Sequence, residues 1–134
     1  MNTTAALTTP RTDLLRFALQ LDAAVTAVNA AVYLAGFWLL DEWLGLPAAL
    51  LIGAGAFLLV FAAFVGRLAA QAQPARPAVL GVIAVNVVWV ADSVLLLALD
   101  AFTPTLAGQV VIALQASGVL ALAALQAAGL RRSA

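Results

Sequence analysis

The sequence predicts an all-α membrane protein: a four-transmembrane-helix bundle with up-down-up-down topology. Of its 134 residues, 66% are hydrophobic and only 9% are charged, and the mean hydropathy is +1.12, whereas soluble domains are about 45–50% apolar and about 25% charged. Four apolar runs each exceed the roughly 20 residues that a helix needs to cross a hydrocarbon core about 30 Å thick. The connectors between the runs are short, which favours helical hairpins in one compact bundle.

The four spans are expected at residues 14–40, 47–70, 77–99 and 104–128. Proline opens the last three spans, where its fixed φ suits the first helical turn and its missing N–H removes no hydrogen bond. Thr103 is a candidate N-cap of the fourth span, and Gly129 is a candidate C-cap. We therefore expect a single domain over residues 13–132, preceded by a flexible cytoplasmic tail at residues 1–12.

The charged residues predict how the spans are oriented. All six arginines fall on one side of the predicted membrane: Arg11, Arg16, Arg67, Arg76, Arg131 and Arg132. The loops on the other side carry Asp41, Glu42 and Asp100 and no arginine. The positive-inside rule then places both termini in the cytoplasm. A signal peptide in the first span is disfavoured, because Asp22 interrupts an apolar run that is already longer than a signal peptide requires.

An internal repeat is also predicted. Residues 26–40 (TAVNAAVYLAGFWLL) and 83–97 (IAVNVVWVADSVLLL) share five identities in fifteen positions, including Asn29 with Asn86. The first helical hairpin would then be duplicated as the second. Since each copy contains two spans, both copies have the same orientation, which predicts a parallel repeat with a pseudo-two-fold axis along the membrane normal.

Four segments together resemble the small four-span integral membrane proteins of high-GC, actinobacterial-type bacteria: LDAAVTAVNAAVYLAG, GLPAALLIGAGAFLLVFAAFV, AVNVVWVADS and LQASGVLALAALQAAGLRR. The resemblance covers roughly residues 14–132 and concerns hydropathy, length and polar placement. It implies a multi-pass protein of the bacterial cytoplasmic (inner) membrane, with no reaction attached.

The missing side chains exclude much chemistry. The chain has no Lys, His or Cys, which excludes His- or Cys-ligated haem, thiolate iron–sulfur clusters and ordinary zinc sites. It also excludes Ser-His and Cys-His nucleophile pairs. Asp22 and Asp92 are expected about 15 Å apart from the helix rise, too far to share a proton. We therefore expect no enzyme activity, cofactor or metal, and a net charge of zero argues against a nucleic-acid partner.

Polar residues inside the spans define a candidate midplane site: Asn29, Tyr33, Asn86, Trp89, Asp92, Ser93 and Gln115. Asp92 lies about 10 Å inside the outer end of its span, where an ionised carboxylate is penalised by at least ~2.5 kcal/mol. No arginine occurs at that depth, so we expect Asp92 to be uncharged, hydrated in an outward-facing cavity, or paired with a partner chain. Asp22, nearer the cytoplasmic side, is expected to act as an interfacial anchor close to Arg16.

Two functions remain open from the sequence. The first is a structural, scaffold or accessory-subunit role in the lipid bilayer, as a homodimer or within a larger membrane complex, with the polar residues forming interhelical hydrogen bonds. The alternative is a transporter or small-ligand-binding protein with a midplane site, in which Asp92 is a proton-linked or cation-linked group.

Overall fold

The computed structural model describes residues 10–99 and 102–133 and contains four helices in that part of the chain. They are α2 (Pro10–Leu44), α3 (Ala48–Ala69), α4 (Arg76–Ala98) and α5 (Leu106–Ser133). Each is long and apolar enough to cross a membrane. The predicted all-α four-helix bundle is confirmed, and the protein is a small multi-pass membrane protein.

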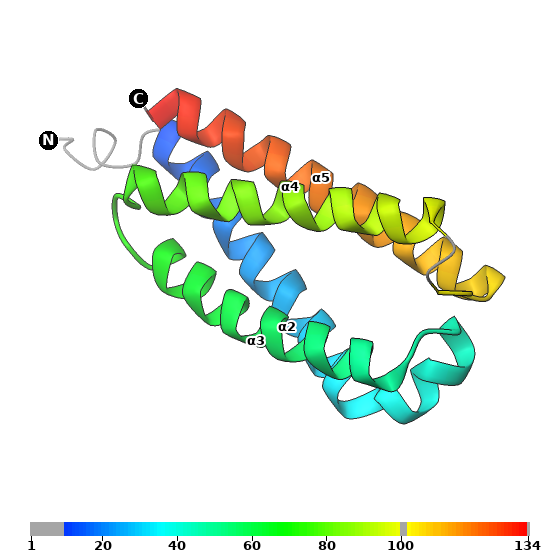
Figure 1. The fold of residues 1–134 in the computed structure, drawn as a ribbon. Helices are drawn as coiled ribbons and strands as arrows, with labels where there is room; N and C mark the ends of the chain where they lie inside the picture. The colour runs from blue at the N-terminus through cyan, green and yellow to red at the C-terminus, as the bar shows by residue number, and fades with distance from the viewer. Residues whose placement is uncertain (1–9, 100–101, 134) are drawn as a thin grey trace, which may run out of the picture.

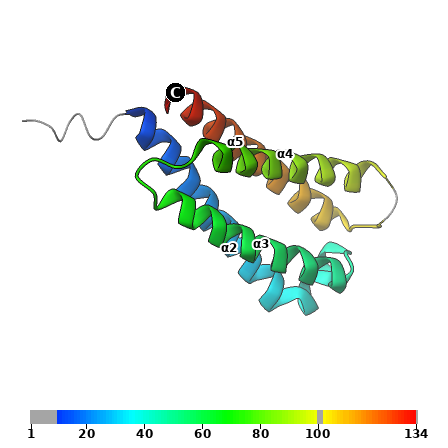
Figure 2. The same ribbon diagram turned by 60° about the vertical axis from the view of Figure 1, so that its left-hand side comes forward.

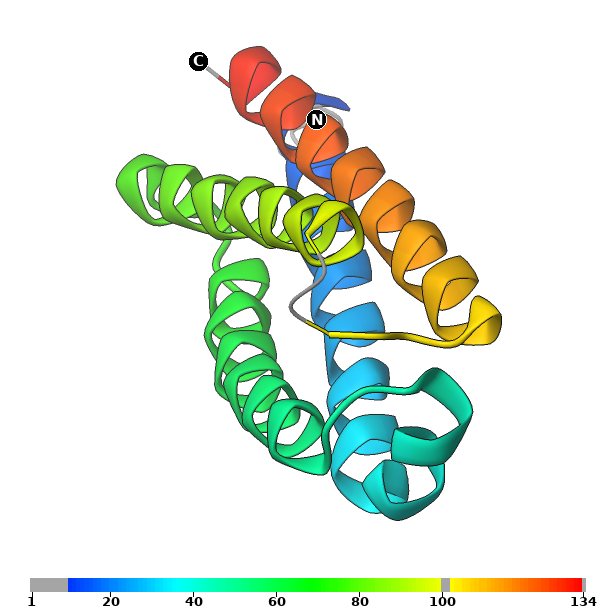
Figure 3. The same cartoon turned by 45° about the vertical axis from the view of Figure 1, so that its right-hand side comes forward.

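Successive helices run in opposite directions (Figure 1). Helix α2 packs against α3 and α5, and α4 packs against α5, whereas α3 and α4 make few contacts with each other. Figures 1 and 3 show α3 and α4 diverging from the short connector that joins them. Of the four pairs of neighbouring helices, three are therefore closely packed, and the α3–α4 pair is open.

The two ends of the bundle differ in charge. The beginning of α2 and the end of α5 lie side by side near the α3–α4 connector (Figure 2). We call this the arginine end, because Arg16, Arg67, Arg76, Arg131 and Arg132 all belong to it. The opposite, acidic end carries Asp41 and Glu42 on the last turns of α2. Asp100 and the tail residues 1–9 lie outside the described residues.

The first connector is shorter than the sequence predicts. Residues 41–44 continue α2 as helix, so that only residues 45–47 join α2 to α3. Gly45 makes the turn with a φ of 68°, a conformation that glycine adopts without a Cβ clash. At the other end of α2, the helix begins at Pro10, which removes residues 10–12 from the predicted flexible tail.

The prediction that Thr103 caps the fourth span is wrong, because Thr105 performs that role. The Thr105 hydroxyl accepts the Gly108 N–H at 3.0 Å and donates to the Trp43 carbonyl at 2.5 Å. Its own N–H donates to the Leu44 carbonyl at 3.0 Å. The residue that starts α5 therefore also fastens it to the end of α2.

The prediction that Gly129 ends the last span is also wrong. Helix α5 continues to Ser133, and Gly129 is buried where α5 crosses the beginning of α2. A Cβ at this position would lie 2.7 Å from the Leu15 Cα and 2.8 Å from its nitrogen. Glycine is therefore needed here for close helix approach, as in other tightly packed membrane helices.

The main hydrophobic core lies toward the arginine end and joins all four helices. Its buried members are Leu15, Leu19, Phe61, Val65, Leu68, Ala69, Val79, Val82 and Leu130. Two smaller clusters follow, one around Ala30, Tyr33 and Leu58 and one at the acidic end around Leu44, Leu46 and Leu51. Buried packing is therefore most extensive at the arginine end, and the cluster at the acidic end is smaller.

The internal repeat stays a prediction. A two-fold axis that exchanges the hairpins would make the α2–α5 interface equivalent to the α3–α4 interface. In the structure, α2 and α5 pack closely whereas α3 and α4 barely touch. The α2 helix also has 35 residues and α4 has 23. The two hairpins therefore occupy unequal environments, and the open interface is where the candidate site lies.

Candidate functional site

A cluster of buried polar side chains joins three helices. Asp22 and Thr26 come from α2, Asn86 from α4 and Gln126 from α5, and we call this set the Asp22 cluster. All four residues are buried, with Asp22 only 1% exposed and Gln126 0% exposed. Such groups are stable inside a membrane protein only when they are hydrogen-bonded to one another.

The hydrogen bonds within the Asp22 cluster satisfy this requirement. Asp22 Oδ2 accepts from Asn86 Nδ2 at 2.8 Å and from Gln126 Nε2 at 2.6 Å. Asp22 Oδ1 accepts from the Thr26 hydroxyl at 2.8 Å. Asn86 Nδ2 also donates to Gln126 Oε1 at 3.0 Å, so both of its N–H groups are used. The cluster therefore links α2, α4 and α5 through hydrogen bonds between its own side chains.

The structure corrects the expected role of Asp22. Asp22 is a central buried acceptor of the bundle, and it is not the interfacial anchor that the sequence suggested. Arg16 lies nearby on the same helix, but its Nε donates to the Ala69 carbonyl at 3.4 Å. The four-residue spacing of Asp22 and Thr26 places both on one face of α2, and this face is buried in the bundle. No sequence signal identified Gln126 as the partner from α5.

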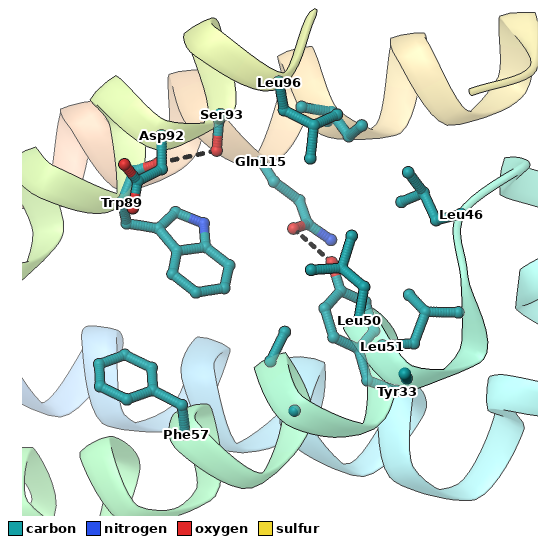
Figure 4. Close-up of a pocket in the computed structure, with 14 residues that line it drawn as sticks. Tyr33, Leu46, Leu50, Leu51, Phe57, Trp89, Asp92, Ser93, Leu96 and Gln115 are labelled. Atoms are coloured by element: carbon teal, nitrogen blue, oxygen red, sulfur yellow. Dashed lines mark hydrogen bonds between the residues drawn. The ribbon is translucent and has the colours of Figure 1, made fainter. Parts of the chain in front are cut away.

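A cavity of about 380 Å³ lies between α3 and α4, on the side of the acidic end. We call it the α3–α4 cavity. Most of its walls are apolar, and Figure 4 shows lining side chains from both helices facing one another across it. The lining residues are Tyr33, Leu46, Ala49, Leu50, Leu51, Gly53, Ala54, Phe57, Trp89, Asp92, Ser93, Leu96, Ile112 and Gln115.

Two of the polar groups around the α3–α4 cavity are paired with each other. The Tyr33 hydroxyl, from α2, donates to Gln115 Oε1, from α5, at 2.7 Å (Figure 4). The Ser93 hydroxyl is satisfied within α4, since it donates to the Trp89 carbonyl at 2.8 Å. These bonds leave the Gln115 amide nitrogen as a donor at the wall of the cavity.

Asp92 differs from the other polar groups of the cavity. Its side chain is exposed, and within residues 10–99 and 102–133 no side chain forms a hydrogen bond or an ion pair with its carboxylate. It lines both the α3–α4 cavity and an adjoining shallower hollow of about 410 Å³ along α4. The carboxylate therefore stands at the boundary between the cavity and the outer surface of the bundle.

Aromatic rings line the same hollows as this carboxylate. The rings of Phe57, from α3, and Trp89, from α4, are stacked with centroids 6.3 Å apart and an interplanar angle of 8°. Phe57 stacks in turn on Phe61 at 5.9 Å. Phe57, Trp89 and Asp92 all line both hollows, so that aromatic rings and a carboxylate are available to the same ligand.

The structure distributes the predicted midplane site over neighbouring hollows. Five of its residues line the α3–α4 cavity: Tyr33, Trp89, Asp92, Ser93 and Gln115. Asn86 belongs to the separate Asp22 cluster. Asn29 is not hydrogen-bonded to Asn86, but both line one small hollow together with Trp89 and Gln115, and Asn29 also lines a second hollow. The α3 wall was missed because the lining residues of α3 are all apolar and give no local signal.

In the described part of the chain, no three acidic side chains come together as metal ligands would. Comparison with protein-family models, with curated proteins and with solved structures finds no match to this chain. The α3–α4 cavity and the Asp22 cluster are the features of the structure that bear on its function.

Proposed function

We propose that this protein binds a small amphipathic molecule in the α3–α4 cavity. The observation that carries the proposal is the cavity itself, whose volume of about 380 Å³ falls within the range of about 300–1,000 Å³ that is usual for small-molecule sites. Apolar walls with a few oriented polar groups are also typical of such sites. Ala49, Gly53 and Phe57 at its edge are exposed, which gives a ligand access from the α3–α4 side.

The position of the cavity supports binding more than conduction. With the arginine end placed in the cytoplasm by the positive-inside rule, the cavity occupies the outer half of the membrane. The core around Leu15, Val65 and Val79 fills the inner half. A ligand would enter from the outer leaflet or the outer surface, and it would meet closed packing on the inner side.

A structural or accessory role is the second candidate, and the Asp22 cluster favours it. The cluster provides the interhelical hydrogen bonds that such a role requires, and it needs no ligand to satisfy its polar groups. In that role the open α3–α4 face would receive a helix from a second copy or from a larger complex. The two candidates differ in whether a small molecule occupies the cavity at saturation.

Gly53 offers a position in the cavity wall where a larger side chain can be added without a clash. It lines the cavity, and a Cβ added there meets nothing within 4 Å. A Gly53→Leu side chain would project into empty space, while the gain in helix propensity is worth up to ~1 kcal/mol. Gly81, on α4, is equally open but does not line the cavity, so Gly81→Leu is the matched control.

The experiment uses Trp89 as the reporter of binding. Trp38 and Trp43 are 64% and 60% exposed, so Trp38→Phe and Trp43→Phe leave a protein whose only tryptophan lines the cavity. Neopentylbenzene, an apolar probe, is titrated in dodecylmaltoside micelles while Trp89 emission is followed. We expect a saturable change that Gly53→Leu abolishes and Gly81→Leu preserves. A linear, unsaturable change, equal in both variants, would refute ligand binding and favour the structural role.

A further inference from the structure

We propose that the ligand of the α3–α4 cavity is a lipophilic organic cation, held by the Asp92 carboxylate and the π-faces of Trp89 and Phe57. This inference rests on the proposed function and names the chemical class of ligand. It goes beyond the cavity because it assigns a charge to the ligand and a role to each group at the boundary of the cavity.

Asp92 lies inside its span, far from the arginines of the described chain. Asp92 lies six positions before Ala98, the end of α4, a distance of about 9 Å along the helix axis. A carboxylate at this depth is poorly solvated, and the arginines of the described chain lie at the opposite end of the bundle. A cation in the α3–α4 cavity would supply the positive charge that the chain itself does not provide.

The aromatic rings beside the cavity also favour a positively charged ligand. A cation close to a ring face is attracted by the ring's quadrupole, and the attraction strengthens when the cation has lost its water. Trp89 and Phe57 line the same hollows as Asp92. A carboxylate beside aromatic faces in an otherwise apolar cavity therefore matches a cation whose charge is carried on an alkylated, weakly hydrated nitrogen.

Inorganic cations, zwitterionic lipid heads and anions match the cavity less well than an organic cation. An inorganic cation needs several oxygen ligands to replace its hydration shell, and among the described residues that line the cavity Asp92 is the only acidic one. A zwitterionic lipid head would bring a phosphate to the same depth, where no arginine of the described helices could meet it. An anionic ligand would be repelled by Asp92. An organic cation with an apolar body matches Asp92, the aromatic rings and the apolar walls of the cavity.

The test compares two probes of the same shape. Benzyltrimethylammonium and neopentylbenzene differ by a quaternary nitrogen in place of a quaternary carbon, so that size and shape are matched and only the charge changes. Each is titrated against the single-tryptophan protein, and against the same protein carrying Asp92→Asn. Glu42→Gln is the control for long-range charge, because Glu42 is an exposed acid of the same end that does not line the cavity.

We expect Asp92→Asn to weaken binding of the cation about ten-fold or more, as removal of a charge partner near 4 Å from a partly desolvated cation requires. Binding of neopentylbenzene should stay within about two-fold, and Glu42→Gln should change neither affinity by more than that. Asp92→Asn should also fold normally, because the Asp92 side chain is exposed and makes no hydrogen bond within the described residues.

Four results would overturn the inference. The first is equal weakening of both probes by Asp92→Asn. The second is displacement of the cation by dodecylphosphocholine, a zwitterionic probe, as effectively as by dodecyltrimethylammonium. The third is a change in oligomer mass on Asp92→Asn, which would make a second copy the partner of the carboxylate. The fourth is saturable binding of neopentylbenzene that Gly53→Leu abolishes, together with cation binding that Asp92→Asn leaves unchanged. This result would refute the inference alone and leave the proposed function standing.

Discussion

The Asp22 cluster predicts that two substitutions of the same residue have very different effects on stability. Replacing Asp22 with Leu removes the shared acceptor of Asn86 Nδ2 and Gln126 Nε2. One N–H of Asn86 keeps its bond to Gln126 Oε1, and the Thr26 hydroxyl can turn to a carbonyl of its own helix. Two amide donors are left without an acceptor. At about 1–2 kcal/mol for each, the variant should lose about 2–4 kcal/mol of unfolding free energy.

Asp22→Asn should be tolerated far better. The new amide can place its oxygen where Asp22 Oδ2 accepts both N–H groups, and its nitrogen where Oδ1 accepts from Thr26. A hydroxyl both donates and accepts, so Thr26 can accept the new N–H. All partners stay satisfied, and the expected loss is below about 1 kcal/mol.

The assay is unfolding in mixed SDS and dodecylmaltoside micelles, followed by far-UV circular dichroism. Wild type, Asp22→Leu and Asp22→Asn are compared under identical conditions at one pH. Equal stability of the Leu variant and the wild type would refute the hydrogen-bond network as a source of stability. An Asn variant as unstable as the Leu variant would refute the proposed exchange of donor and acceptor at Thr26.

Two further predictions follow from packing and hydrogen bonding. Asn86→Ala should destabilise the bundle by about 1–3 kcal/mol, because Asn86 forms hydrogen bonds with two partners in the Asp22 cluster. Asn29→Ala should lower the unfolding free energy by less than about 0.5 kcal/mol. Equal losses in the same unfolding assay would contradict this difference. Gly108→Ala should destabilise the bundle by about 1–3 kcal/mol, since a Cβ there collides with the backbone of α2. Gly118→Ala, where a Cβ meets open space, should stabilise the bundle by up to ~1 kcal/mol. Melting temperatures that shift in the same direction in both variants would contradict the close approach of α5 to α2 at Gly108.

Much of the fold could be predicted from the sequence, because it follows from local properties. The length and apolarity of the four runs determine the spans, and the distribution of arginine separates the two ends of the bundle. The lack of any basic residue near Asp92 was equally readable, since it depends only on position along the chain. These features need no knowledge of which helix packs on which.

The features that could not be predicted depend on contacts between distant segments. Gln126 lies 104 positions from Asp22 in the chain, and its role appears only once α5 is packed on α2. Gly129 resembled a helix end by composition, and only the crossing with Leu15 explains it. The α3–α4 cavity was hidden for the same reason, because it arises from an interface that fails to close.

The central claim is that a small organic cation occupies the α3–α4 cavity, and site-specific photolabelling tests it most directly. A benzyltrimethylammonium derivative with a diazirine on its ring is photolysed with the wild-type protein, and the labelled residues are identified by mass spectrometry. We predict labels on residues of α3 and α4 that line the cavity, such as Ala54, Phe57 and Trp89, and their loss in Gly53→Leu. Labels spread over the lipid-facing surface, unchanged by Gly53→Leu, would contradict the claim.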